Sequence, residues 1–366
     1  MKISSFNIEN IFQRHTALIK KYRKSRLPDW EEELNSLMTR ELKTTSEMER
    51  IEELIGFLNI NSQSNSARFE LKRFDKGFKL RLNSYDYLPK ASDLTNWEGW
   101  MPLASQPISN TAVFHKAKVI ADINPDMLFL QEVESRNALI EFHNTYLKKE
   151  FNLHFEEVYF SPTNDNLDRG FGLFLKPGYK VNSIKSHINL KTQHGEPLFD
   201  FDLLEIVIDL PNQKKLLCLH THFSEDNLTK IQAQARYLTE IYHKRKILFE
   251  NIIVLGCLQL PSFSQELAPL FKELKLQAVS RHKQFSVIPD FGNDASYYRL
   301  GGYAKGVNIK QQDYILLPKN LYTKINHCGL NRQALWPEKQ PQWQLYPTLK
   351  KQSQGASEHP LLWVSI

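Results

Sequence analysis

The chain has 366 residues, of which 41% are hydrophobic and 24% are charged. This composition excludes an intrinsically disordered chain and predicts a folded protein with material for one large core or two smaller ones. The net charge of +6 favours an anionic partner but is too small to require one. No apolar run approaches the length of a membrane span, so we expect none.

The cysteines suggest a reducing compartment. Cys218, Cys257 and Cys328 are odd in number, widely spaced and without a CxxC pair. This pattern predicts neither a disulfide framework nor a structural zinc site. The first residues already read as a strand, and no leader-like apolar segment precedes them. We therefore expect a cytoplasmic protein.

Residues from about 13 to 110 differ in pattern from the rest of the chain. Apolar residues at helical spacing predict a helix over 47–58, with Ser46 and Glu49 as its capping box, and an earlier helix opened by Pro28. Between 68 and 88, apolar and charged residues alternate around Asp75-Lys76-Gly77, which predicts a hairpin with a basic solvent face. We expect this part to be a helical and hairpin insertion.

After the insertion, strands and helices alternate. A helix over 111–122 leads into a wholly apolar strand at 125–130, which is typical of a strand buried on both faces. Long strands with few helices between them favour two stacked β-sheets covered by helices over a doubly wound parallel sheet. Further strands are predicted at 171–176, 199–210, 215–223, 252–256, 313–317 and 361–365, and further helices at 136–149 and 228–248.

Six short motifs place polar residues at strand ends. Each has an ordinary structural interpretation, because carboxylates at strand exits and histidine pairs on one strand face are most often surface groups. In chain order they are Phe6-Asn7-Ile8-Glu9-Asn10, Leu130-Gln131-Glu132-Val133-Glu134, Asp168-Arg169-Gly170, Leu219-His220-Thr221-His222-Phe223-Ser224, Gln312-Asp313-Tyr314-Ile315-Leu316 and Ser357-Glu358-His359-Pro360. Together and in this order, they resemble the motifs of the endonuclease/exonuclease/phosphatase (DNase I-like) family.

The resemblance implies a fold, an activity and a metal. The fold would be a four-layered α/β/β/α sandwich of residues 1–366 as a single domain, with the insertion at about 13–110. The activity would be phosphoester hydrolysis with a divalent cation, Mg²⁺ or alternatively Mn²⁺. Because Mg²⁺ prefers oxygen ligands, we expect Glu132, Glu9, Asn7 and Glu358 to hold it, with Asn7 alternatively orienting the phosphate.

The same resemblance implies roles around the phosphate. His222 and His359 would hydrogen-bond the phosphoryl oxygens and stabilise the transition state. Asp313 suits the role of fixing the tautomer and orientation of His359. Arg169 offers a planar fork for phosphate, and His220, on the same strand face as His222, is a further candidate.

A seventh motif departs from the family. Val254-Leu255-Gly256-Cys257-Leu258-Gln259 resembles its Gly-Asp-Phe/Leu-Asn turn, with Cys257 in place of the water-activating aspartate and Gln259 in place of asparagine. A thiol prefers softer metals than Mg²⁺, and losing a general base costs on the order of 10²–10⁴ in rate. A covalent role for Cys257 is the weaker interpretation, because a cysteine nucleophile needs a histidine within hydrogen-bond reach. The ordinary interpretation is a small buried residue at a strand end.

Three functions remain open from the sequence. The leading hypothesis is a divalent-metal-dependent, nuclease-like phosphoesterase, weakened by Cys257 and Gln259. The chief alternative is a catalytically inactive family member that binds nucleic acid, a phosphorylated ligand or a protein partner. The third is a small-molecule or lipid-headgroup phosphatase. For an enzyme, the expected partner is nucleic acid or another phosphoester substrate.

Overall fold

The structure, a computed structural model, describes residues 1–15, 27–38, 40, 42–58, 72–75, 78–81, 99–100, 105–165, 167, 169–291, 311–337 and 341–366. The chain divides into two units, a larger one formed by Met1–Phe12 with Ile108–Ile366 and a smaller one formed by Gln13–Pro107. The smaller unit has nearly the bounds predicted for the insertion. That the whole chain forms a single domain stays a prediction.

The smaller unit contains both predicted helices and the predicted hairpin. The start of its second helix differs from the prediction, because the capping box is formed by Thr44 and Glu47. The Thr44 backbone N–H donates to Glu47 Oε2 at 2.7 Å, and the Glu47 backbone N–H donates to Thr44 Oγ1 at 3.3 Å. Its elements are α1 (Leu27–Met38), α2 (Thr45–Leu58), β2 (Gln13–His15), β3 (Lys72–Asp75), β4 (Phe78–Arg81), β5 (Gly99–Trp100) and β6 (Ser105–Pro107). The side chains of the hairpin β3–β4 lie outside the described residues.

The larger unit is built on two β-sheets. The first sheet has the strand order β15-β17-β18-β1-β7-β9-β8, and the second has the order β10-β11-β12-β13-β16-β14. Parallel pairs include β1 with β7 in the first sheet and β12 with β13 in the second. The strands are β1 (Lys2–Asn7), β7 (Met127–Val133), β8 (Glu157–Ser161), β9 (Gly170–Leu175), β10 (Lys180–Ser186), β11 (Leu203–Asp209), β12 (Lys215–His222), β13 (Ile252–Cys257), β14 (Gln277–Ala278), β15 (Phe285–Ser286), β16 (Asp313–Leu317), β17 (His327–Asn331) and β18 (Leu361–Ser365).

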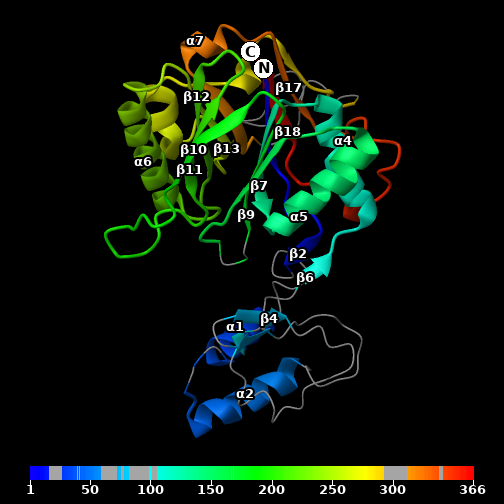
Figure 1. The fold of residues 1–366 in the computed structure, drawn as a ribbon, viewed down its shortest axis with the longest axis vertical. Coiled ribbons are helices and arrows are strands. Elements are labelled where there is room, and N and C mark those ends of the chain that lie inside the picture. The colour runs from blue at the N-terminus through cyan, green and yellow to red at the C-terminus, as the bar shows by residue number, and fades with distance from the viewer. Residues whose placement is uncertain are drawn as a thin grey trace. The chain divides into compact units, whose positions relative to one another are not determined.

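Helices cover the outer face of each sheet (Figure 1). α4 (Asn110–Ile123), α5 (Arg136–Glu141) and its π-helical continuation η2 (Phe142–Glu150) pack on the first sheet, and α6 (Leu228–Lys246) packs on the second. The predicted four-layered α/β/β/α sandwich is therefore confirmed. Short helical segments complete the unit: η3 (Gln265–Leu267), η4 (Pro269–Glu273), η5 (Val279–Arg281), α7 (Lys319–Tyr322) and η7 (Gln352–Gln354).

Strand β12 shows how the sequence produces these layers. Side chains alternate between the two faces of a strand, so Leu216 and Cys218 enter the core between the sheets while Leu217 and Leu219 pack under α6. Both faces are buried, which explains why the strand reads as a continuous apolar run. The next residues on the face between the sheets are His220 and then His222, both fully buried.

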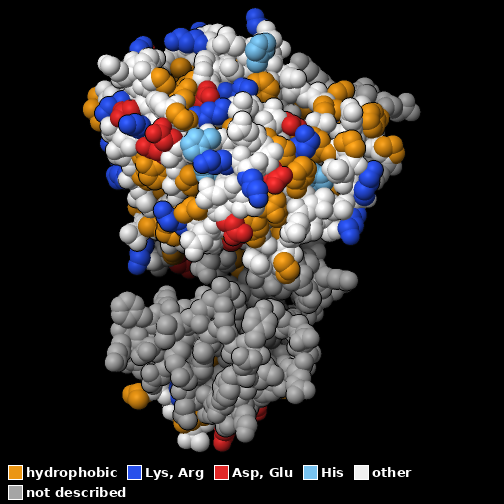
Figure 2. All heavy atoms as spheres, turned by 45° about the vertical axis from the view of Figure 1, so that its right-hand side comes forward, with side chains coloured by type: hydrophobic (Ala, Val, Ile, Leu, Met, Phe, Trp, Pro, Cys, Tyr) orange, Lys and Arg blue, Asp and Glu red, His pale blue; other side chains and the backbone are white. Residues whose placement is uncertain are grey.

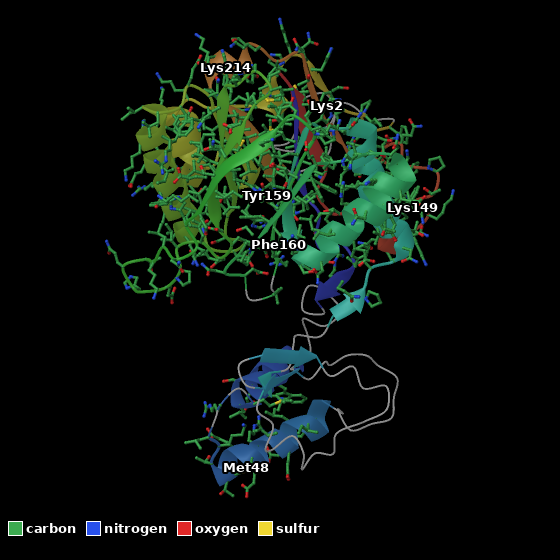
Figure 3. The ribbon with its side chains drawn as sticks, in the orientation of Figure 1. Lys2, Met48, Lys149, Tyr159, Phe160 and Lys214 are labelled. Atoms are coloured by element: carbon green, nitrogen blue, oxygen red, sulfur yellow. The ribbon has the colours of Figure 1, made fainter. Side chains whose placement is uncertain are left out.

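The sequence did not predict strands β8 and β10, and it placed the start of β11 too early. β10 is an edge strand with mostly exposed side chains, so it carries no apolar alternation. β8, which carries Tyr159 and Phe160, is the edge strand of the first sheet and is partly buried along its whole length (Figure 3). β11 begins at Leu203 and not at residue 199, because the Asp202 carboxylate accepts the Leu203 backbone N–H at 2.7 Å and holds a turn there.

The exterior gives little direct indication of a partner. On the face of the larger unit seen in Figure 2, Lys and Arg side chains are interspersed with Asp and Glu, and hydrophobic side chains lie between them. The positive charge is therefore not gathered into one patch on that face. Among the described residues, no helix is both long and apolar enough to cross a membrane.

Candidate functional site

The predicted site residues lie at strand ends along one edge of the two sheets. In the first sheet, the parallel strands β1 and β7 end near Asn7 and Glu132. In the second sheet, the parallel strands β12 and β13 end with His222 opposite Cys257, and the antiparallel strand β16 begins with Asp313 opposite Cys257. Parallel strands bring their carboxyl ends to the same edge of a sheet, so the topology gathers residues that are far apart in sequence.

Glu132 is the centre of the first group, which we call the Glu132 cluster: Asn7, Glu132, Arg169 and His222. Its Oε1 accepts from Asn7 Nδ2 at 2.7 Å and lies 3.1 Å from His222 Nε2, while Oε2 accepts from Arg169 Nη1 at 2.6 Å. Burial opposes ionisation of Glu132, but the Arg169 charge and the hydrogen bonds from His222 and Asn7 outweigh it and hold its pKa well below the usual range. The carboxylate is therefore ionised although it is buried.

The Arg169 guanidinium contacts carboxylates on several sides. Its Nε and Nη2 donate to Asp165 at 2.8 and 3.0 Å, and Nη2 lies 3.5 Å from Glu225 Oε1. The guanidinium carbon lies 4.9 Å from the centre of the Phe201 ring, and the side chain is 6% exposed. The sequence predicted a fork available to phosphate, whereas the structure directs this fork at Glu132 and Asp165.

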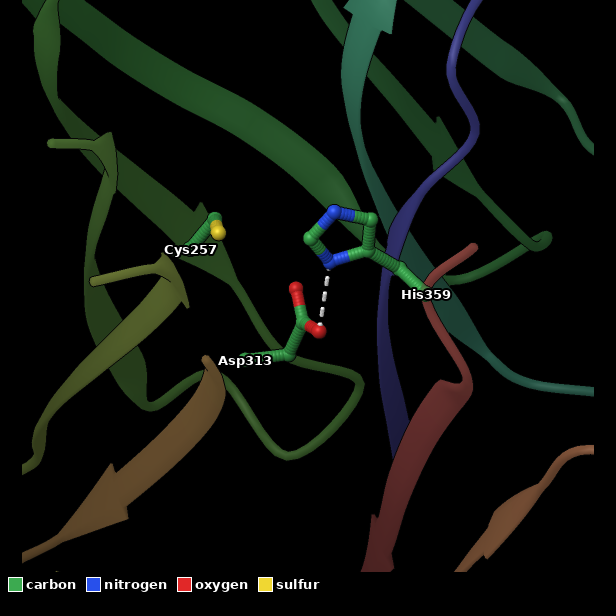
Figure 4. A group of neighbouring side chains, drawn as sticks. All are labelled: Cys257, Asp313 and His359. Atoms are coloured by element: carbon green, nitrogen blue, oxygen red, sulfur yellow. Dashed lines mark hydrogen bonds and ion pairs between the residues drawn. The ribbon is translucent and has the colours of Figure 1, made fainter. Parts of the chain in front are cut away.

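The second group, which we call the thiol cluster, is formed by Cys257, Asp313 and His359 (Figure 4). His359 Nδ1 lies 2.8 Å from Asp313 Oδ2, the arrangement expected for a carboxylate that orients a histidine. Burial lowers the pKa of His359, but the adjacent Asp313 outweighs it and raises this pKa well above the ordinary value. The His359 side chain is 13% exposed, so this imidazolium borders solvent.

Cys257 stands at the position where the resembled motif has an aspartate, and its chemistry differs from that of a carboxylate. The residue is fully buried, and both burial and the neighbouring Asp313 charge raise the pKa of its thiol to about 12. A thiol with that pKa is protonated near neutral pH and accepts no proton from water. The thiol cluster therefore keeps the predicted histidine and its carboxylate but lacks a general base at this position.

The end of strand β13 requires a glycine. Gly256 has a φ of 127°, and a Cβ atom there would lie 1.8 Å from the Thr221 carbonyl oxygen. Only glycine permits this close approach of β12 and β13. Beyond the strand, Gln259 has a left-handed backbone, with a φ of 63°, and its Oε1 accepts from Gln312 Nε2 at 3.5 Å.

Four of the eight described non-glycine residues with a positive φ lie at the same edge. Besides Gln259, Glu9, Asn10 and Glu132 have φ values of 48°, 63° and 59°. Glu132 lies where the pairing of β7 with β9 slips, so a bulge re-aims its side chain. Non-glycine residues in this region persist only where their surroundings fix them, and they concentrate at functional sites.

Besides Gln259, three predicted residues belong to neither cluster. The carboxylate of Glu9 accepts the Glu358 backbone N–H at 2.8 Å, and Glu358 itself is exposed. His220 lies between the aromatic rings of Phe129 and Phe171 in the core, and burial lowers its pKa to about 3. His220 is therefore a neutral core histidine, 2.7 Å from Gln131 through Nε2.

The predicted Mg²⁺ ligands are not gathered as a metal site. Among the described residues, two groups place three ligand atoms within 4.8 Å of one another: Cys257, Asp313 and His359, and Glu132, His222 and Glu225. Neither group contains Glu9 or Glu358. The first offers a thiol that Mg²⁺ disfavours, and in the second both Glu132 oxygens already face nitrogen groups. The side chains as placed do not fit Mg²⁺, and its binding stays a prediction.

Sequence reasoning missed Asp165 and did not foresee the contacts that Glu225 and Asn10 make. Asp165 and Glu225 flank Arg169 in space, and the Asn10 backbone N–H donates to the Glu132 carbonyl at 2.7 Å. The available signals were weak: Asp165 lies four residues before Arg169, and Glu225 follows the histidine motif directly. Asp168, part of the motif that singled out Arg169, lies outside the described residues.

A surface hollow lies elsewhere on the molecule. It has a volume of about 510 Å³ and is bordered by α6 and the segments η3 and η4. Its lining includes Arg236, Glu240 and Lys272, and it contains none of the predicted site residues. The hollow is therefore separate from the candidate site at the strand ends.

Several solved structures are similar to this chain. A mannosyl-6-phosphatase from Bacteroides thetaiotaomicron is 10% identical, with a TM-score of 0.47 over 70% of this chain and 89% of that one. An endonuclease/exonuclease/phosphatase family protein from the same organism is 10% identical, with a TM-score of 0.47 over 69% and 88%. The human Nocturnin catalytic domain with bound sulfate is 15% identical, with a TM-score of 0.45 over 68% and 85%.

These likenesses do not extend to sequence. No protein-family model matches the chain, and no curated protein matches it. At the identities and TM-scores given, a neighbour's activity does not transfer to this chain. The fold of this chain is thus similar to that of a solved protein of the endonuclease/exonuclease/phosphatase family, which is the family that the motifs of this chain resemble.

Proposed function

We propose that the candidate site binds a phosphoester and does not hydrolyse it at the rate of an enzyme. The observation that carries this proposal is the thiol cluster, in which Asp313 orients the His359 imidazolium and a protonated thiol, Cys257, stands where the resembled motif has an aspartate. The site has kept a group that recognises phosphate and has lost the group that would activate water.

Recognition of the phosphate rests first on His359. Its Nδ1 is held by Asp313 at 2.8 Å, so Asp313 fixes the ring and keeps it charged. A charged donor bordering solvent makes stronger hydrogen bonds to a phosphate oxygen than a neutral donor does. The net charge of +6 also favours an anionic ligand.

Slow hydrolysis follows from the same residues. With a pKa raised to about 12, the Cys257 thiol does not take a proton from an attacking water. Replacing a general base in this way costs on the order of 10²–10⁴ in rate. No hydrolytic step is assigned to a metal ion, because both oxygens of Glu132 already face nitrogen groups.

The ligand class is the phosphoester group shared by nucleic acids and small phosphorylated molecules. Glu225 is 42% exposed and lies beside Arg169, and Asp226 follows it, so negative charge borders the site. Acidic side chains there disfavour a long polyanion more than a ligand with one phosphate group. We therefore expect a small phosphoester to bind more tightly per phosphate than a nucleic acid.

Metal-dependent hydrolysis is the second candidate function. It is favoured by Glu132 and His222 of the Glu132 cluster together with the neighbouring Glu225, because these three side chains place ligand atoms within 4.8 Å of one another. An enzyme of this kind would cleave a phosphoester only with Mg²⁺ or Mn²⁺, and Glu132→Gln would abolish the reaction. Product analysis after ligand binding separates this candidate from the first.

The test measures binding and turnover together. Labelled single-stranded DNA, RNA and a small phosphomonoester are titrated into the whole protein, with product analysis after each titration in Mg²⁺ and in Mn²⁺. We expect binding without product, and about tenfold weaker binding for His359→Gln, because a charge-assisted hydrogen bond is lost. His327→Gln, an exposed histidine at the start of β17, is the matched control and should bind normally. Absence of binding by every ligand, or rapid turnover of any of them, would refute the proposal.

A further inference from the structure

The Glu132 carboxylate has a nitrogen group at each oxygen. Oε1 is 2.7 Å from Asn7 Nδ2 and 3.1 Å from His222 Nε2, and Oε2 is 2.6 Å from Arg169 Nη1. The Glu132 and Arg169 side chains are 7% and 6% exposed, so water contributes little to either. An ionised carboxylate buried in this way needs a counter-charge, and here the counter-charge is the guanidinium.

Asn7 is oriented as a donor and not as a metal ligand. Its Oδ1 accepts the Glu9 backbone N–H at 3.2 Å, which turns its Nδ2 toward Glu132. An amide that shared a cation with Glu132 would present its oxygen on that side.

Arg169 is held rigidly in its place. Asp165 accepts from Nε and Nη2 at 2.8 and 3.0 Å and from the Arg169 backbone N–H at 3.1 Å. The Phe201 ring packs against the guanidinium with 4.9 Å between its centre and the guanidinium carbon. The remaining nitrogen, Nη1, is thereby aimed at Glu132. A side chain held in this way is a fixed part of the site and not a mobile surface charge.

We propose that the guanidinium of Arg169 takes the place of a divalent cation as the permanent counter-charge of Glu132, so that the site takes up neither Mg²⁺ nor Mn²⁺. Arginine suits this role because it stays charged at all physiological pH values and is weakly hydrated. Mg²⁺ requires near-octahedral oxygen ligands and retains several waters, for which a carboxylate surrounded by nitrogen donors is a poor partner. If the proposed phosphoester binding also holds, that binding needs no metal.

Binding of Mn²⁺ alone to the whole protein tests this inference. Mn²⁺ is titrated into the wild type and into Arg169→Gln, and the bound ion is followed by water proton relaxation and by the melting temperature in parallel. The wild type should bind no Mn²⁺ at Glu132, so its response to Mn²⁺ should equal that of Glu132→Gln. Arg169→Gln frees the carboxylate, so it should melt at a lower temperature without metal and gain a saturable Mn²⁺ response, with a rise of a few degrees in melting temperature. Adding Glu132→Gln to this variant should abolish the gain.

The chain offers a matched control for the loss of a buried ion pair. Arg245, which is 29% exposed, pairs with the buried Glu205, and His187 and Lys185 also lie beside this carboxylate, so an arginine, a glutamate and a histidine meet here as they do at Arg169, Glu132 and His222. Arg245→Gln should lower the melting temperature without creating a Mn²⁺ response, because no third metal-ligating group of the described residues lies beside Glu205 and His187.

Two results would overturn the inference. One is stoichiometric Mn²⁺ binding by the wild type that Glu132→Gln abolishes. The other is a folded Arg169→Gln variant without a Mn²⁺ response. If Arg169→Gln does not fold, the comparison of the wild type with Glu132→Gln still decides. Because Mn²⁺ is the only ligand added, failure of phosphoester binding would refute the proposed function and leave this result standing.

Discussion

At the scale of single residues, the pair formed by His359 and Asp313 controls the charge of the candidate site. Their nitrogen and oxygen atoms are 2.8 Å apart, and the carboxylate raises the histidine pKa well above its ordinary value of about 6.5 against the opposing effect of burial. The imidazolium therefore stabilises the fold below about pH 6.5, and this contribution is lost as pH rises through the higher pKa of the folded state. Phosphate affinity should likewise decrease when His359 loses its proton.

Asp313→Asn should make phosphate binding depend on pH at mildly acidic values. Without the carboxylate, burial dominates and lowers the His359 pKa below its ordinary value of about 6.5, so the variant's phosphate affinity relative to that of the wild type should decline as pH rises through this lowered pKa. The histidine titration followed by NMR, together with inorganic phosphate titrations at each pH, checks both effects. Asp209→Asn, at the end of β11, is the control and should change neither. Identical pH profiles for Asp313→Asn and the wild type would show that Asp313 does not set the charge of the site.

From the sequence, the proximity of the site residues was easier to predict than the role of each residue. His359 beside Asp313 was predicted, because a histidine motif and an aspartate strand are recognisable separately. The role of Arg169 was not, because its partners Glu132 and Glu225 are distant in sequence and only the folded chain brings the three together. Motifs identify residue types, whereas the hydrogen-bond partners of a guanidinium depend on tertiary geometry.

At the scale of elements, the candidate site depends on strand ends. Strands with two buried faces were predictable because they are continuously apolar, as β7 and β12 are. The edge strand β10 and the short β17 were not, since solvent-exposed side chains and a glycine remove the apolar pattern. The end of β13 adds a steric requirement, because a Cβ atom on Gly256 would collide with the backbone of the neighbouring strand β12.

Gly256→Ala should destabilise the larger unit strongly. The new Cβ would lie 1.8 Å from the Thr221 carbonyl oxygen at a φ of 127°, so backbone must shift. We expect a loss of roughly 3 kcal/mol or more in the free energy of unfolding, measured by urea denaturation. Gly56→Ala is the control: no heavy atom lies within 4 Å of its added Cβ in α2, so this variant should be stabilised by about 0.5–1 kcal/mol. A Gly256→Ala protein as stable as the wild type would contradict the steric account.

At the scale of the whole molecule, the chain leaves the larger unit and returns to it at neighbouring points. Phe12 ends the first segment of this unit and Ile108 begins the second, and the Ile108 backbone N–H donates to the Phe12 carbonyl at 2.7 Å. All residues of the Glu132 cluster and of the thiol cluster belong to this unit. An inserted segment whose ends are adjacent can be removed without stretching the remaining chain.

Replacing residues 13–107 by a short glycine linker should leave the larger unit folded. We expect one cooperative unfolding transition and unchanged phosphate affinity, because the site residues and the core between the sheets all remain. Circular dichroism melting and phosphate titration measure the two outcomes. A variant that is unfolded, or that is folded but no longer binds phosphate, would show that the smaller unit is required for the fold or for the site.

The central claim is that the site binds a phosphoester without a metal ion and without turning it over. Calorimetric titration of the tightest-binding phosphoester into the wild type tests this most directly, first in a chelator and then in Mn²⁺, with product analysis at the end of each run. The account predicts equal affinity in both runs and intact ligand in both. Binding that requires Mn²⁺, or product that forms in Mn²⁺ and disappears in Glu132→Gln, would contradict it.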